Sequence, residues 1–197
     1  MIISVIFVLL FLAFLMGIIL VPKIDGKINM IKVAVMGIMA IFCYQSFWAF
    51  MFQLVGIPVN LKSTCISMAA AVLLLWGMII KKKKMQRIFV RITDIAVLAV
   101  LAGIVIAVSL HMFTPYLRLS YINSDPANHF NDAMVIVKQG VLGKHIYFSA
   151  FVNAMFIEIF SPILIVSKYY KAFIFADIFM HVLEVWMCYV LMLTVSE

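Results

Sequence analysis

Long apolar runs, interrupted by short and mostly basic gaps, limit how this chain can fold. Of its 197 residues, 67% are hydrophobic and 12% are charged, whereas soluble proteins average about 45–50% apolar and about 25% charged residues. A soluble domain with so few charges could not cover its own surface, which excludes a soluble globular enzyme, a disordered chain and a disulfide scaffold. The sequence therefore predicts an integral membrane protein.

Six runs reach or approach the length of about 20 residues that a helix needs to cross a hydrocarbon core about 30 Å thick. They are Met1–Val21, Val33–Gly56, Ser63–Ile80, Ile92–Phe113, Tyr147–Ser167 and Ala172–Val195. The first run is too long for a signal peptide and has no basic segment before it. Because no linker interrupts the chain, residues 1–197 are expected to form a single membrane domain. The expected fold is an all-α, polytopic helix bundle with about six transmembrane helices.

The basic residues predict the orientation in the cell membrane. Of the 15 Lys and Arg residues, eleven lie in the gaps on one side of the membrane and four in those on the other. Because cytoplasmic loops carry the excess of Lys and Arg, we expect loop 81–91 in the cytoplasm, and loop 114–146 and both termini outside it. Lys81–Lys84 can instead bind anionic headgroups. No basic stretch alternates with aromatic residues as a nucleic-acid groove requires, so no nucleic-acid partner is expected.

The gap over residues 114–146 is the longest and contains signals for a short helix. Pro126 suits the first position of a helix, Asp125 is a strong N-cap and Gly140 is a natural C-cap. A helix over Pro126–Gln139 is therefore predicted, with about 14 residues and a length of about 21 Å. It is too short and too polar to span a membrane. An apolar stripe places this amphipathic helix in the outer membrane interface; the stripe consists of Ala127, Phe130, Met134 and Val137.

Two carboxylates and an imidazole share one face of this predicted helix. Asp125, His129 and Asp132 follow the spacing i, i+4 and i+7. Such a group can act as general base and acid, orient a sugar hydroxyl, or bind a divalent cation through Asp125 and Asp132. In the alternative, purely structural interpretation, Asp125 only caps the helix, His129 is a solvated surface residue, and Asp132 pairs with Arg118 or a lysine.

The segment Ser124–Phe130 resembles a known membrane enzyme loop. It follows a span that ends in a Pro/Tyr-rich stretch and precedes an amphipathic helix that ends in Lys-Gln-Gly. This arrangement resembles the first large extracytoplasmic loop of the GT-C superfamily, integral membrane glycosyltransferases that use polyprenyl-phosphate-linked sugars. The resemblance covers about Ile92–Ser167 and implies that Asp125 lies at an active site, with His129 and Asp132 beside it.

The same resemblance implies a partial or reduced relative, because members of the superfamily usually have eight or more spans. Such a chain can be too short to be active alone. A lipid-linked donor also needs a phosphate site, for which Arg118, Lys144 and His145 are the candidates on the membrane side. Snorkelling or headgroup contact explains Arg118 and Lys144 equally well. The expected partners are membrane lipids, a polyprenyl-phosphate-linked sugar and other envelope-assembly subunits.

Four ionisable residues fall inside the last two predicted spans, where a charge is costly. They are Glu158, Asp177, His181 and Glu184. Glu158 and Glu184 lie at similar depths below the outer ends of their spans and are expected to face each other. The group can form a proton or cation path with His181 as the relay. Alternatively, a neutral carboxyl favoured by desolvation shares a hydrogen bond there, or Glu158 forms the floor of a cavity below loop 114–146.

Three functions follow from these patterns. The leading hypothesis is a membrane glycosyltransferase-like protein acting at the extracytoplasmic face. The second is a proton- or cation-coupled transporter subunit that uses the intramembrane acids and His181. The third is a non-catalytic subunit of a cell-envelope polysaccharide assembly system.

Overall fold

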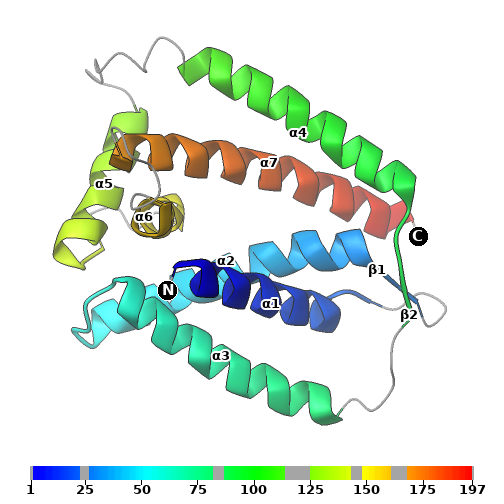
Figure 1. Cartoon of the computed structure of the whole chain (residues 1–197), viewed down its shortest axis with the longest axis horizontal. Helices are drawn as coiled ribbons and strands as arrows, with labels where there is room; N and C mark the ends of the chain where they lie inside the picture. The colour runs from blue at the N-terminus through cyan, green and yellow to red at the C-terminus, as the bar shows by residue number, and fades with distance from the viewer. Residues whose placement is uncertain are drawn as a thin grey trace. The chain divides into compact units, whose positions relative to one another are not determined.

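The computed structural model describes residues 2–22, 27–81, 87–113, 125–142, 148–160 and 168–196 (Figure 1). In this part of the chain, helices and two short strands follow one another in the order α1, β1, α2, α3, β2, α4, α5, α6, α7. The helices are α1 (Ile2–Leu20), α2 (Met30–Leu54), α3 (Leu61–Lys81), α4 (Ile92–Phe113), α5 (Asp125–Gln139), α6 (Phe148–Phe160) and α7 (Lys168–Ser196); the strands are β1 (Lys27–Asn29) and β2 (Arg87–Phe89). The prediction of an all-α fold is confirmed.

Four of the helices are long and apolar enough to cross a membrane. Their qualifying segments are Met30–Leu54, Leu61–Met78, Ile92–His111 and Tyr169–Ser196. The apolar segments Val5–Leu20 and Ser149–Phe160 are shorter, so the structure supports four of the six predicted spans.

The structure describes only part of the span predicted over Tyr147–Ser167. The helix described there, α6, has 13 residues, which corresponds to about 20 Å. Tyr147 and residues 161–167 of the predicted span lie outside the described residues.

The residues form two compact units, of which unit 1 comprises Met1–Tyr44, Cys65–Gly103 and Leu183–Glu197. In unit 1, α1 and α2 approach each other closely at two glycines. A Cβ added at Gly17 would lie 2.0 Å from the carbonyl oxygen of Val33, and one added at Gly37 would lie 1.9 Å from that of Ala13. Small residues at four-residue spacing allow helix backbones to approach in this way.

A buried polar cluster joins the other elements of unit 1. The Asn29 amide donates to Asp94 Oδ2 at 3.1 Å, and the Tyr189 hydroxyl donates to Asp94 Oδ1 at 3.0 Å. Asp94 lies in the first turn of α4. The parallel pairing of β1 with β2, with Asn29 opposite Phe89, holds Asn29 near this point. The cluster therefore ties α4 and α7 to the strand before α2.

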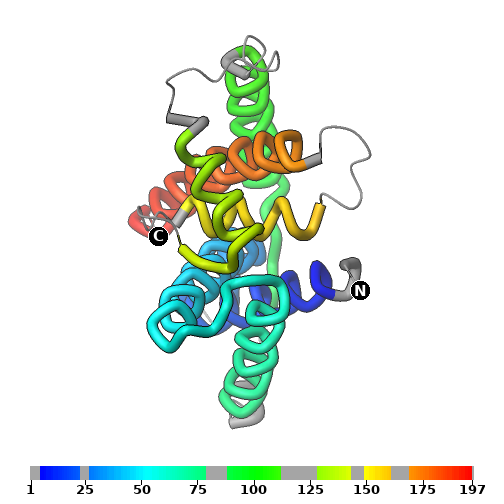
Figure 2. The backbone as a smooth tube through the Cα atoms, turned by 90° about the vertical axis from the view of Figure 1, so that its left-hand side faces the viewer, coloured from blue at the N-terminus to red at the C-terminus, as the bar shows by residue number. Residues whose placement is uncertain are grey.

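Unit 2 comprises Gln45–Thr64 and Ile104–Val182. Its central element is α6, in which every residue from Ala150 to Ile157 is buried. Figures 1 and 2 show α5 lying across α6, and the two helices are in contact. Aromatic rings add to the packing, because Phe130 of α5 contacts Tyr170 and Phe173 of α7 edge-on.

Candidate functional site

The amphipathic helix α5 forms where its capping signals predict it. It runs over Asp125–Gln139, against a prediction of Pro126–Gln139 with Asp125 as N-cap. At its end the Gly140 N–H donates to the Ile136 carbonyl at 2.8 Å, and Gly140 has a φ of 67°. This left-handed geometry suits glycine and makes Gly140 a helix C-cap. The backbone of Asp125 is described, but its side chain lies outside the described part of the structure.

The buried face of α5 is shifted from the predicted apolar stripe. The fully buried side chains are Ala133, with 0% exposure, and Ile136, with 3%. Phe130, Met134 and Val137 are only half-buried, and the side chain of Ala127 is not among those described. Neither of the fully buried residues belongs to the stripe that the sequence pattern predicted. The structure therefore buries α5 along Ala133 and Ile136.

The shift brings polar groups of α5 into the protein interior. His129 and Asp132 are half-buried, and the His129 Nδ1 and Asp132 Oδ2 atoms are shielded from solvent. Asn128 and Asn131, next to them in sequence, are exposed. His129 is therefore less exposed than its neighbours Asn128 and Asn131. One polar atom of each side chain, His129 and Asp132, is covered by protein atoms.

The end of α2 and the loop that follows it contact the end of α5. The Val59 N–H donates to the Gly140 carbonyl at 2.7 Å, and the Leu142 N–H donates to Gln53 Oε1 at 3.1 Å. A Cβ added at Gly140 would lie 3.0 Å from Pro58 Cβ, so the loop packs directly against the helix cap. The sequence pattern did not predict these contacts. A polar Gln53 near the end of an apolar run was the available signal.

Glu158 binds the N-terminus of α3. Its carboxylate accepts a hydrogen bond from the Leu61 N–H, the first residue of that helix. Asn60 Oδ1 accepts from the next two N–H groups, those of Lys62 at 2.9 Å and Ser63 at 3.1 Å. In return, the Asn60 N–H donates to Ser63 Oγ at 2.9 Å. Glu158 therefore places a carboxylate at the positive end of a helix, where negative charge is stabilising.

The other intramembrane candidates lie on α7. His181 Nε2 and Asp177 Oδ2 are 3.6 Å apart, at the predicted i, i+4 spacing, and both side chains are partly exposed. Glu184 is exposed and belongs to unit 1, whereas Glu158 belongs to unit 2. Asp177 is therefore paired with His181, whereas Glu158 bonds to the backbone at the start of α3.

The predicted phosphate and metal sites are not tested by these contacts. Arg118, Lys144 and His145 lie outside the described residues. Among the side chains that the structure describes, no three His, Cys, Asp or Glu residues lie close enough to hold a metal ion. The proposed cation ligand Asp125 is not among those side chains.

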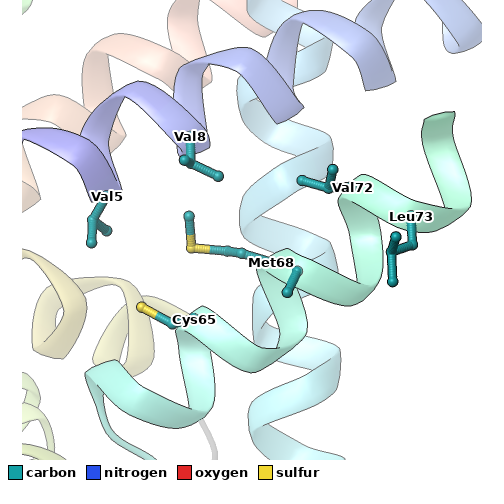
Figure 3. A pocket seen from close by; sticks show the side chains of 7 residues that line it. Val5, Val8, Cys65, Met68, Val72 and Leu73 are labelled. Carbon is teal, nitrogen blue, oxygen red and sulfur yellow. The ribbon is translucent and has the colours of Figure 1, made fainter.

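An apolar pocket of about 640 Å³ lies in unit 1 between α1 and α3 (Figure 3). Val5 and Val8 line it from α1, and Met68 extends from α3 toward them. The remaining lining residues are Cys65, Ala69, Val72 and Leu73. The lining contains no charged side chain, and its one ionisable group is the Cys65 thiol.

These features define an α-helical, multi-pass membrane protein in which a few polar groups are buried in unit 2. A scan against protein-family models found no matching model, and searches of curated proteins and of solved structures found no matching protein.

Proposed function

We propose that this chain acts as a membrane glycosyltransferase of the GT-C type, transferring a sugar from a polyprenyl-phosphate donor to an envelope glycan. The observation that carries the proposal is helix α5, which begins at Asp125 and in which His129 Nδ1 and Asp132 Oδ2 are shielded from solvent. The likeness of Ser124–Phe130 to the GT-C loop supplies the reaction class. The excess of Lys and Arg in loop 81–91 supports placing α5 at the extracytoplasmic face.

The proposed reaction needs a general base. The acceptor hydroxyl oxygen attacks C1 of the donor sugar while the bond between C1 and the phosphate oxygen breaks, and polyprenyl phosphate leaves with the bonding electrons. Asp125 takes the hydroxyl proton. His129 and Asp132 orient the acceptor from the same helix.

The leaving phosphate needs positive charge. In the proposal this comes from Arg118, Lys144 and His145, whose N–H groups form charge-assisted hydrogen bonds to phosphate oxygens. Asp125 and Asp132 are the residues that would hold a divalent cation if transfer requires one.

Replacing Asp125 by asparagine tests the base directly. Asparagine caps helices about as well as aspartate, so the Asp125→Asn variant keeps α5 but loses the base. We expect transfer to fall by about 10²–10⁴-fold. The assay measures transfer of radiolabelled hexose from a polyprenyl-phosphate donor in isolated membranes, and Asn128→Ala, an exposed site on the same helix, serves as the control. Full transfer by Asp125→Asn would contradict the proposal.

A second candidate is proton- or cation-coupled transport. It is favoured by the Asp177–His181 pair, because an imidazole beside a carboxylate can relay a proton near neutral pH. In that case His181→Gln abolishes coupled uptake while sugar transfer is unaffected. The glycosyltransferase proposal predicts that His181→Gln leaves transfer unchanged and that cells lacking the chain show no uptake defect.

A non-catalytic role in envelope assembly has its own signature. Deleting the chain would then reduce the glycan, but the Asp125→Asn variant would restore it fully. The glycosyltransferase proposal predicts that this variant fails to restore the glycan.

A further inference from the structure

Asn153, in the middle of α6, is a buried amide whose polar atoms have no protein partner. Its side chain is 1% exposed, and within the described residues neither Oδ1 nor Nδ2 makes a hydrogen bond. Its neighbours Val152 and Ala154 are apolar and equally buried. The amide therefore lies in the apolar interior of unit 2.

An unpaired buried amide is costly, because each polar group forfeits its hydration without receiving a hydrogen bond. A leucine has a similar size and would fill the space without that cost. Buried polar groups of this kind are normally satisfied by water or by a ligand. Asn153 thus points to a bound group that supplies the missing hydrogen bonds.

The position of Asn153 connects it to the candidate site. It belongs to the helix across which α5 lies, and His129 Nδ1 and Asp132 Oδ2 on α5 are also shielded from solvent. Two helices in contact therefore each contribute polar atoms to the interior of one unit.

We propose that the Asn153 carboxamide binds a hydroxyl group of the donor sugar. This inference rests on the proposed glycosyltransferase function and adds a sugar-binding residue to it. A carboxamide offers an acceptor and two donors, which match a hydroxyl that both donates and accepts. A hydrocarbon chain offers neither. A resident water offers the same chemistry as a sugar hydroxyl, so the experiment separates these two sources.

The experiment compares the wild type with Asn153→Leu in detergent micelles. The probes are farnesyl phosphate and farnesyl phosphate linked to glucose, mannose or N-acetylglucosamine. We expect Asn153→Leu to raise the thermal unfolding temperature without probe, because it removes two unpaired groups. We expect it to weaken binding of the preferred sugar-bearing probe about tenfold and to leave the affinity for farnesyl phosphate unchanged. Ile157→Leu, an apolar exchange in the same helix, is the control and should not discriminate between the probes.

Three results would overturn the inference. A lower unfolding temperature for Asn153→Leu would mean that the amide has protein partners. A raised unfolding temperature with unchanged sugar binding would assign the amide to a resident water. If the wild type bound no sugar-bearing probe more tightly than farnesyl phosphate, both this inference and the proposed function would fall. A different result would separate the two proposals. If sugar binding depended on Asn153 but Asp125→Asn transferred sugar at the full rate, the inference would stand and only the role of Asp125 as base would be contradicted.

Discussion

Glu158 illustrates how single residues organise the interior of unit 2. A carboxylate within an apolar run indicates a functional group when only the sequence is known. In the fold, Glu158 accepts from the Leu61 N–H while Asn60 serves the next two N–H groups of α3. Its position at the helix terminus explains why a carboxylate is tolerated there.

Two substitutions of Glu158 should therefore affect stability in a graded way. Glu158→Leu leaves the Leu61 N–H unpaired and is expected to destabilise the fold by about 1–3 kcal/mol. Glu158→Gln keeps an acceptor but loses the charge, so we expect a smaller loss of about 0.3–1 kcal/mol. Thermal unfolding in detergent measures both. A Glu158→Gln variant as unstable as Glu158→Leu would contradict the assignment.

The sequence predicts the residues of the site only where the signals are local. Asp125, Pro126 and Gly140 define α5 because capping depends on residues within one turn. The partnership of Glu158 with Leu61, and that of Gln53 with Leu142, joins residues far apart in the chain. No spacing rule predicts such pairs. The inward direction of His129 depends likewise on which face of α5 packs.

At the scale of helices and strands, hydropathy locates apolar segments better than it determines their lengths. The predicted runs starting at Val33, Ser63 and Ile92 coincide with long helices, but α7 begins at Lys168, before the predicted start at Ala172. The strands β1 and β2 were not predicted, because three-residue segments carry no measurable periodicity and their pairing is non-local.

The close packing of α1 on α2 gives a sharp test at this scale. Gly37→Leu would add a side chain at a position where a Cβ alone would lie 1.9 Å from the Ala13 carbonyl oxygen. We expect the two helices to separate and the fold to lose about 3 kcal/mol, the upper end of the range for overpacking.

Gly77→Leu is the matched control, since a Cβ there meets no atom within 4 Å. Thermal unfolding should show a large loss for Gly37→Leu and little change for Gly77→Leu. Equal effects of the two substitutions would contradict the close approach of α1 and α2.

At the scale of the whole molecule, the described residues of the candidate site belong to one unit. The side chains of Asn153, His129 and Asp132 all lie in unit 2, whereas the described part of the basic loop 81–91 lies in unit 1. The proposed chemistry requires the head of α5 to face the extracytoplasmic side, where the lipid-linked donor would be used. The proposed sugar transfer therefore depends on the orientation of α5 relative to the membrane.

Cysteine labelling in intact cells tests that orientation most directly. The native Cys43, Cys65 and Cys188, all exposed, are first replaced by alanine. Single cysteines then replace Asn131 on α5 and Arg91 before α4, two exposed positions. With a membrane-impermeant maleimide, we predict that Asn131→Cys is labelled in intact cells and that Arg91→Cys is labelled only after permeabilisation. The reverse pattern would place α5 in the cytoplasm and contradict transfer at the extracytoplasmic face.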